Sequence, residues 1–450
     1  MLSKQLTTCL AVGVGILGLG FARSNVAVAQ EKVTLVERFD AANPYRVELK
    51  VRLSGRLAVA FEKGKPPEVL PFSGSSTLVY DEKVLPADEP RTAKAIRVYR
   101  ETEFARTIDG KEQKADIRPA VRRMVVLRSE RGKKVPFSPD GPLTWSEIDL
   151  IRTDLFSLAL VTGLLPAKPV SPGDKWNASP NAVGDLTDFD PIEEGGLVVE
   201  FLSVVTLNNK KYAKLQISGT VKGVTDDGPS RQQLSGTAYF DLEANRLTYL
   251  NLKGVHELLG PDGKTTGRVD GTFVMTRGPA SRGDGLTPTD LQGIALSPTP
   301  ENSLLLYDNP DFGVKFLHPR RWRVGTVQGK QLTIEESGGG GILLTAESNS
   351  TLPTPEQYLT ESRAYLAKQK WTVNGSDQPR RISDTPDRVD RFAIDAEVDK
   401  QHVQMEYAVV AQAVGGATIA ARLPWAEREE LRKDVDRIIK SLQIIKRIEK

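Results

Sequence analysis

The sequence predicts a multidomain protein with an all-β first domain and an α+β second domain. Three observations support this prediction. Long segments alternate between apolar and polar residues, glycines recur on their apolar side, and helical spacing appears near the C-terminus. We expect a signal peptide at residues 1–29 and a curved antiparallel sheet or half-barrel with one covering helix at 30–277. A Gly/Pro/Ser/Thr linker follows at 278–302, and an α+β sandwich at 303–450.

The first 29 residues have the order of a secretory signal peptide. Lys4 precedes a short apolar run at residues 10–21, and Ala27-Val28-Ala29 supplies a cleavage site. Because this run is too short to cross a bilayer as a helix, we expect a mature chain without a transmembrane segment. Cys9, the only cysteine, lies in this segment without a lipobox, so no lipid anchor is expected. The mature protein is therefore expected to be periplasmic or extracellular.

The charge balance argues against some classes of partner. Removal of residues 1–29 leaves 59 basic and 58 acidic groups, because only Lys4 and Arg23 are lost with them. A chain so close to neutrality has no electrostatic footprint for nucleic acid and no polybasic tail for a membrane surface. A chain without cysteine in an oxidising compartment depends on its hydrophobic cores, and each domain is long enough to form one.

Residues 46–61 give the clearest strand pattern. Apolar side chains fall on one side of it, at Val47, Leu49, Val51, Leu53, Leu57, Val59 and Phe61. Charged side chains fall on the other side, at Glu48, Lys50, Arg52 and Arg56. This alternation is typical of an antiparallel strand with one buried and one solvated face.

Glycine interrupts the apolar side of five such segments. These interruptions are Leu53-Gly55-Leu57, Ile217-Gly219-Val221, Leu234-Gly236-Ala238, Leu252-Gly254-His256 and Val269-Gly271-Phe273. Glycine inside an element costs about 0.5–1 kcal/mol relative to alanine. Five glycines in one phase therefore indicate that the sheet bends there or that something lies close to it. We place them on the concave side, where the candidate ligand-facing residues are Gly219, Gly236, Gly254, His256, Gly271 and Phe273.

Turn signals separate the strands of the first domain. They are Asp109-Gly110, Asp227-Gly228, Asp262-Gly263 and Asn245. The β pattern breaks at residues 145–165, where helical spacing predicts a helix that covers one face or plugs one mouth of the sheet. Its apolar positions are Ile148, Leu150, Ile151, Leu155, Phe156 and Leu158. Prolines after Leu165 end it.

Charge is unevenly distributed within the first domain. Residues 91–134 contain fourteen Lys or Arg and six acids, whereas residues 177–209 contain six acids and no base. The basic segment is either an anion-binding face or is neutralised by the acidic segment across the sheet. We favour neutralisation, because charge runs usually have a structural explanation.

The second domain combines helices with strands. Thr354-Pro355-Glu356-Gln357 predicts an N-cap, a proline at the first helical position and a capping-box partner. The stripe of this helix is Tyr358, Leu359, Ser362, Tyr365 and Leu366. A last helix begins after Pro424 and has an apolar face at Leu431, Val435, Ile438, Ile439 and Leu442. Residues 403–409 alternate as a strand between the two helices.

Residues 303–445 resemble the PsbP-like fold family, which includes thylakoid-lumen photosystem subunits and bacterial envelope proteins of the DcrB type. The resemblance is carried by Tyr307-Asp308, Gly313-Val314-Lys315-Phe316, Pro319, Trp322, the segment Thr354 to Leu359 and Ile438-Ile439-Lys440-Ser441-Leu442. It implies an accessory or binding role outside the cytoplasm, and no catalytic residue comes with it. The first domain resembles uncharacterised exported bacterial proteins through residues 135–145, Pro172-Gly173-Asp174-Lys175-Trp176 and Tyr239-Phe240-Asp241-Leu242.

The sequence contains few signals for catalysis. His256, His318 and His402 have no metal-ligand spacing, and we expect a structural role for the first and exposure for the other two. The mature chain has neither GxSxG nor SxxK. An acidic segment offers oxygen ligands for calcium, although a solvated loop is the favoured interpretation. Its members are Asp185, Asp188, Asp190, Glu193 and Glu194.

Three functions remain open from the sequence, and none of them requires a cofactor. The first is a non-enzymatic envelope protein that acts as a binding or accessory module, with another protein as its partner. The second is a carrier of a lipid or other hydrophobic small molecule in the concave face of the first sheet. The third is a carboxylate-based hydrolase, for which no pair of residues stands out. We favour the first.

Overall fold

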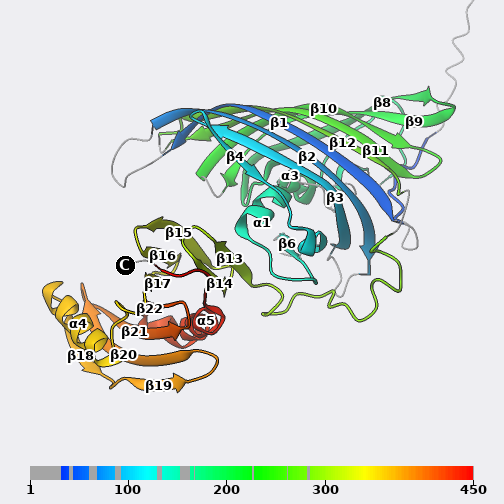
Figure 1. Ribbon diagram of the computed structural model, residues 1–450. Coiled ribbons are helices and arrows are strands. Elements are labelled where there is room, and N and C mark those ends of the chain that lie inside the picture. Colours follow the sequence, from blue (N-terminus) through cyan, green and yellow to red (C-terminus); the bar gives the residue numbers. More distant parts are fainter. Residues whose placement is uncertain are drawn as a thin grey trace, which may run out of the picture.

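The computed structural model describes residues 32–39, 44–59, 68–86, 93–128, 134–152, 163–166, 168–225, 228–260, 262–280 and 284–448. The chain is mostly β and is built from several antiparallel sheets, none of which closes in its described part. An N-terminal part is organised around one large sheet, and a C-terminal part around two smaller sheets (Figure 1). The expected signal peptide, Phe61 of the first predicted strand and Asp227 of one predicted turn lie outside the described residues.

The large sheet contains twelve described strands. Its order is β6-β5-β3-β2-β1-β12-β11-β10-β9-β8-β7, and β4 pairs with β3. The strands are β1 (Tyr45–Val59), β2 (Glu68–Leu85), β3 (Ala93–Ile108), β4 (Lys111–Ala115), β5 (Arg123–Arg128), β6 (Lys134–Phe137), β7 (Lys175–Asn177), β8 (Ile192–Leu207), β9 (Lys210–Thr225), β10 (Gly228–Asp241), β11 (Arg246–Leu259) and β12 (Thr265–Pro279). The first and last long strands, β1 and β12, are direct neighbours, so the two ends of the domain sequence meet in the middle of the sheet.

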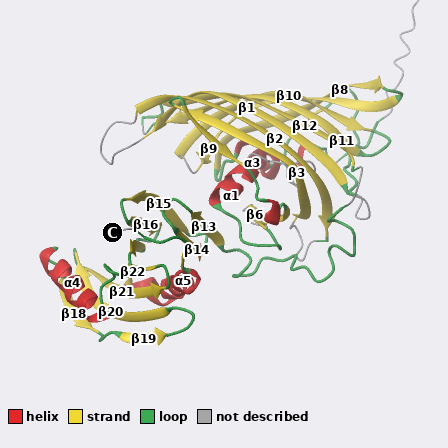
Figure 2. Ribbon diagram, viewed as in Figure 1, coloured by secondary structure: helices red, strands yellow, loops and turns green. Residues whose placement is uncertain are grey.

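The large sheet is arched, and two helices lie on its concave side (Figure 1, Figure 2). They are α1 (Trp145–Arg152) and α3 (Pro180–Thr187), and a single turn of 3-10 helix, η1, spans Pro119–Val121. Leu150 of α1, Leu186 of α3 and Phe240 of β10 belong to one hydrophobic core. The antiparallel, curved sheet agrees with the prediction. Helix α1 covers the start of the helix expected at 145–165, and residues 153–162 lie outside the described residues.

Helix α3 was not predicted from the sequence. Ser179 begins it, since its Oγ accepts a hydrogen bond from the Ala182 backbone N–H at 3.2 Å, and Pro180 occupies the first turn. A serine followed by proline is a helix-start signal that could have identified it. The helix is only eight residues long and contains Gly184, which weakens the helical pattern.

The acidic segment does not neutralise the basic one. Residues 91–134 supply β3 and β5 near one end of the sheet order, whereas 177–209 supply β8 near the other end. The predicted mutual neutralisation is therefore wrong. Ion pairs form locally instead, as between Arg118 and Glu147 at 2.7 Å and between Lys222 and Glu194 at 2.5 Å. Sequence segments show charge but not which strands lie side by side.

The segment between the two parts packs along the first sheet. Leu286 is buried and belongs to a small core with Phe137 of β6, against which Leu291 and Leu296 also pack. The backbone N–H of Leu306 then donates to the Leu143 carbonyl at 2.7 Å. Leu305 beside it is fully buried in the core of the first part, so the two parts share a joint.

In its described residues, the C-terminal part has two antiparallel sheets, two α-helices and one turn of 3-10 helix. One sheet has the order β13-β14-β23, and the other has β15-β16-β17-β22-β21-β20-β18, with β19 paired to β20. The strands are β13 (Leu305–Asn309), β14 (Val314–His318), β15 (Trp322–Gln328), β16 (Gln331–Glu336), β17 (Gly341–Glu347), β18 (Thr372–Ser376), β19 (Arg380–Ser383), β20 (Arg388–Val398), β21 (Gln401–Gln412), β22 (Gly415–Pro424) and β23 (Gln443–Ile444). The helices are α4 (Pro355–Lys368), α5 (Arg428–Ser441) and the short η2 (Trp425–Glu427).

Both predicted helices of this part are present. Thr354 and Gln357 form the expected capping box of α4, with bonds of 2.8 and 3.2 Å. Helix α5 buries its predicted face from Leu431 to Leu442. In the predicted stripe of α4, Leu359, Ser362 and Leu366 are buried, whereas Tyr365 is 61% exposed. His318 was expected to be exposed but is buried, because it follows Val314 and Phe316 on the inner side of β14. Burial lowers its pKa.

Candidate functional site

Glycines from separate strands meet in one line across the large sheet. We call it the glycine row: its residues are Leu197, Gly219, Leu234, Gly254, Gly271, Leu53 and Gly74, in that order, each the direct cross-strand neighbour of the next. The row crosses seven strands from β8 to β2. Sequence spacing reveals each glycine, but only the strand register reveals that they align.

Leucine side chains of the neighbouring strands lie over these glycines on the concave face. A Cβ added to Gly254 would lie 2.7 Å from Cδ2 of Leu234, and one added to Gly271 would lie 2.8 Å from Cδ2 of Leu53. At Gly219 and at Gly236 nearby, the added atom would overlap a backbone carbonyl oxygen of the next strand. Glycine is therefore needed at Gly219 and Gly236 for the strands to approach so closely, whereas at Gly254 and Gly271 the obstacle is the movable end of a leucine side chain.

A hollow lies on the opposite face of the sheet, over the glycine row. Its volume is about 960 Å³. Successive side chains of a strand point to opposite faces, so the residues on either side of the glycine row point into this hollow. They form two lines across six strands. The first line is Thr107, Ser73, Ser54, Asp270, Val255 and Gln233, and the second is Ala105, Ser75, Arg52, Thr272, Lys253 and Ser235.

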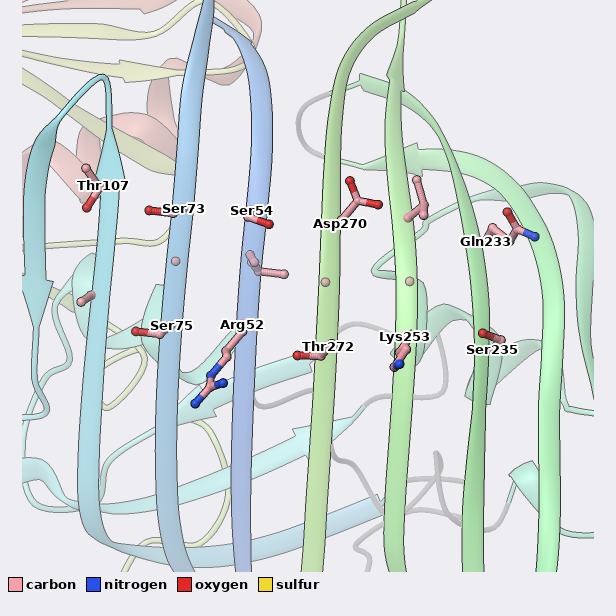
Figure 3. A pocket seen from close by; sticks show the side chains of 16 residues that line it. Arg52, Ser54, Ser73, Ser75, Thr107, Gln233, Ser235, Lys253, Asp270 and Thr272 are labelled. Carbon is pink, nitrogen blue, oxygen red and sulfur yellow. The ribbon is translucent and has the colours of Figure 1, made fainter. Parts of the chain in front are cut away.

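We call this surface the polar hollow. Figure 3 shows the two lines, with Thr107, Ser73, Ser54, Asp270 and Gln233 above Ser75, Arg52, Thr272, Lys253 and Ser235. The floor between them is formed by Leu53, Gly74, Gly254 and Gly271 of the glycine row. The side-chain positions of these four residues lie on the concave face. A ligand in the hollow would therefore contact their backbone atoms. Gly254 and Gly271, which leucine side chains cover on the concave face, thus also form part of the floor of the hollow on the outer face.

Hydroxyl groups and cations dominate the chemistry of the polar hollow. Six of its residues carry a hydroxyl, and Arg52 and Lys253 are exposed. Its carboxylate, Asp270, pairs with Arg268 at 3.1 Å, and the hydrogen bond raises the pKa of Arg268. The hollow therefore offers many hydrogen-bond donors and two cations to a ligand. Sequence reasoning noted Arg52 on the polar side of its strand but did not identify this surface.

The six candidate ligand-facing residues lie close together in the sheet. Gly219, Gly254 and Gly271 belong to the glycine row, and the last two also line the polar hollow. Gly236 pairs with Leu252, which pairs with Phe273, one step along the strands. The side chain of Phe273 is almost wholly buried in the core. The partly buried His256 lies with its ring centroid 6.0 Å from that of the core residue Phe189.

A second group of polar residues is buried at one end of the sheet. Tyr45 donates to Glu82, which also pairs with Arg97, and Arg277 pairs with Glu37 at 2.9 Å. Burial raises the pKa of Glu37, and burial together with Glu82 raises the pKa of Tyr45 well above its ordinary value. All five side chains are almost fully enclosed, so this network holds strands together rather than facing a ligand.

The acidic segment considered for calcium is solvated at four of its five carboxylates, Asp188, Asp190, Glu193 and Glu194, but it is divided between α3, a short turn and β8 and does not form one loop. Asp185 lies in α3 and is 2% exposed, and Asp188 ends that helix in a left-handed conformation. Within the described ranges, no group of three or more His, Cys, Asp or Glu side chains is arranged to hold a metal ion. None of the helices in the described part of the chain has the length and apolar character needed to span a membrane.

Comparisons with known proteins add little to this geometry. No family model and no curated protein matches the sequence. Among solved structures, PsbP from the cyanobacterium Synechocystis sp. PCC 6803 is 12% identical, and the match covers 31% of this chain and 92% of that chain with a TM-score of 0.25. DynF from the dynemicin biosynthesis pathway of Micromonospora chersina is 10% identical, with 60% and 95% covered and a TM-score of 0.13. Likeness at these scores assigns neither a fold nor a function.

Proposed function

We propose that the chain is an exported, non-enzymatic binding module of the cell envelope, and that the polar hollow is the surface that contacts its partner. The observation that carries this proposal is the pair of polar lines that six strands bring together around the hollow. The lining offers hydrogen-bond donors and cations, whereas its carboxylate is engaged by Arg268. That composition suits recognition better than acid–base chemistry.

The partner in this proposal is another protein. A hollow that spans six strands is about 24 Å wide, since neighbouring strands lie about 4.8 Å apart. That width, in a hollow that is open to solvent, suits a segment of a protein surface better than a small molecule, because small-molecule sites are mostly enclosed. For residues 303–450 we propose a PsbP-like accessory domain, supported by the motifs quoted above and by the α+β arrangement of α4, α5 and their sheets.

Site-specific photo-crosslinking in the native envelope tests this function. Benzoylphenylalanine replaces Ser73 or Ser235 in the polar hollow, and Thr333, an exposed strand residue of the C-terminal part, serves as the matched control. We expect both hollow positions to crosslink one and the same polypeptide, and the control not to. Crosslinks from Thr333 with none from the hollow would reject the hollow as the contact surface. Cell fractionation of the same strain tests export.

A carrier of a hydrophobic small molecule is the second candidate. It is favoured by apolar side chains of the concave face that stay partly exposed, including Leu53, Phe72 and Leu258. The substitution Gly236→Leu would not test binding of such a molecule, because the leucine side chain would overlap the carbonyl oxygen of Asn251 and disrupt the sheet. Leu258→Trp instead adds a bulky side chain to the concave side, near the turn that joins β11 and β12, without replacing a glycine. Mass spectrometry of solvent extracts should then show less bound lipid than in the wild type, and equal amounts would count against a carrier.

A hydrolase is the candidate with the least support. Glu37, Asp81, Glu82 and Glu147 are buried carboxylates of the first part, and each pairs with an arginine. Because each of these carboxylates is occupied by an ion pair with an arginine, it suits a structural role better than general acid catalysis.

A further inference from the structure

Two cations of the polar hollow have no acidic partner among the residues that the structure describes. Arg52 of β1 and Lys253 of β11 are both direct neighbours of Thr272 on β12, which lies between them. Their backbones are therefore about 10 Å apart, two strand spacings. Neither forms an ion pair within the described part of the chain, although every other charge that lines the hollow is paired. They are exposed and available to a ligand.

A third cation adds to this excess at the edge of the hollow. Arg56 follows Arg52 on the same face of β1, and its direct cross-strand neighbour is Arg268. Like charges directly opposite each other destabilise a sheet. Asp270 pairs with Arg268, and Glu257, which faces Arg268 from the other side, pairs with Arg231, so neither carboxylate pairs with Arg52, Arg56 or Lys253. Since this arrangement works against the stability of the fold, it indicates a surface that is completed by negative charge from outside.

The remaining side chains favour recognition by charge and hydrogen bonds. The lining contains six hydroxyls and the amide of Gln233 but no aromatic ring. A neutral glycan would be expected to stack its sugar rings on aromatic side chains, and none is present among these residues. Carboxylates, in contrast, accept bidentate bonds from arginine and further bonds from lysine and hydroxyl groups. The chemistry of the hollow is therefore complementary to carboxylates.

We propose that the polar hollow binds an acidic segment of the partner protein, in which one carboxylate pairs with Arg52 and another with Lys253. This inference rests on the proposed function and adds the chemistry of the partner surface. Two cations about 10 Å apart match acidic residues that lie two to four positions apart in an extended chain, at about 3.3 Å per residue. A segment of about seven residues would span the hollow.

Carbodiimide coupling tests the contact at the level of single atoms. The reagent joins a lysine Nζ to a carboxylate in direct contact as an amide, with loss of one water. In native envelopes we expect Lys253 to couple to an Asp or Glu of another polypeptide, identified by mass spectrometry of the branched peptide. Lys253→Arg keeps the charge but cannot couple, so it should abolish this product while the complex persists. Coupling of Lys253 to Asp270 of its own chain would overturn the proposal, as would an adduct with the mass of a uronic acid.

Binding measurements on the complex provide the second readout. Arg52→Gln should weaken binding of the coupled partner about three- to tenfold and reduce its dependence on salt, as loss of an interfacial charge does. Lys433→Gln on α5 is the matched control, because it removes one exposed positive charge far from the hollow. Equal affinities for the wild type and Arg52→Gln would contradict the proposal.

The two proposals can fail separately. If Ser73 and Ser235 photo-crosslink a protein but Lys253 does not couple and Arg52→Gln binds normally, the hollow is a contact surface without an acidic partner, and this inference is wrong. If neither type of crosslink forms, the proposed function itself is wrong.

Discussion

Gly236 and Gly254 lie on neighbouring strands, yet a side chain would meet different obstacles at each. At Gly254 the nearest atom to an added Cβ is the tip of a side chain, Cδ2 of Leu234, at 2.7 Å. At Gly236 it is the backbone carbonyl oxygen of Asn251. A leucine tip moves by changing its rotamer, whereas a carbonyl in a sheet moves only with its strand. The two glycines therefore differ in how strictly the bend requires them.

We predict that Gly236→Ala destabilises the first part by about 1–3 kcal/mol, the usual cost of overpacking, and that Gly254→Ala costs less. Urea denaturation of both variants, followed by circular dichroism, measures this difference. The two substitutions remove the same glycine entropy from the unfolded chain, so each is a control for the other. Equal stability losses would show that the sheet adapts at both positions and that the bend does not depend on Gly236.

At the scale of the element, the start of α1 depends on one buried carboxylate. Glu147 accepts bonds from Arg118 Nε at 2.7 Å and Nη2 at 2.9 Å, and from the Thr144 backbone N–H at 2.7 Å. Its own N–H donates to Thr144 Oγ1 at 3.2 Å, which completes a capping box. Burial acts to raise the pKa of Glu147, but the hydrogen bonds outweigh it and hold the pKa below 4.5.

Because that pKa is lower in the folded protein than in the unfolded chain, the ionised carboxylate stabilises the fold. Its contribution is complete above about pH 4.5 and is lost as the pH falls through the lowered value. We predict that Glu147→Gln lowers the free energy of unfolding by about 1–3 kcal/mol at pH 7. The difference from the wild type should shrink as the pH is lowered below about 4.5. Urea titrations across this range measure it.

Glu194→Gln is the control for the pH series. Glu194 also has a lowered pKa because Lys222 binds it, but this pair is exposed on β8 and β9. We expect Glu194→Gln to have the same free energy of unfolding as the wild type at each pH, since exposed ion pairs contribute little to stability. A wild-type advantage over Glu147→Gln that does not shrink at any pH below 4.5 at which the protein stays folded would contradict the capping role of the ionised carboxylate.

The elements also show how far the sequence alone can predict this molecule. Alternation along β1 correctly predicted its buried and exposed faces, and Thr354 to Gln357 predicted the start of α4, because both patterns are local. The polar hollow was not predicted, since it requires Arg52, Thr272 and Lys253 to be aligned by strand pairing across more than 200 residues of sequence. His318 was misjudged because its neighbour Pro319 suggested a loop, whereas the strand buries it. Local periodicity therefore predicts which face of a strand is buried, whereas a surface shared by several strands depends on how those strands pair.

At the scale of the whole molecule, the two parts are held by a small set of contacts. Arg320 lies before β15, and its Nε donates to the Ser303 carbonyl at 2.9 Å while Nη2 donates to the carbonyl of Pro136 in β6. Burial lowers the pKa of Arg320 to about 10, which still leaves it protonated at neutral pH. Its neighbour Arg321 pairs instead with Glu430 at 2.9 Å and Asp434 at 2.5 Å, both in α5. Arg320 therefore joins the two parts, whereas Arg321 acts within one.

We predict that Arg320→Ala loosens this joint without unfolding either part. The substitution removes the hydrogen-bond donor of the Ser303 and Pro136 carbonyls. We expect this to cost about 1–3 kcal/mol of local stability, which weakens the attachment of the segment 284–304. Since about 1.4 kcal/mol changes a population tenfold, thermolysin should cut this segment roughly ten times faster than in the wild type. Arg321→Ala should leave the cleavage rate unchanged, because its partners lie in α5 alone.

Circular dichroism of both variants should match the wild type, which separates a loosened joint from a general loss of fold. Equal cleavage of wild type and Arg320→Ala would mean that Leu305 and the Leu306 to Leu143 bond hold the joint without the arginine.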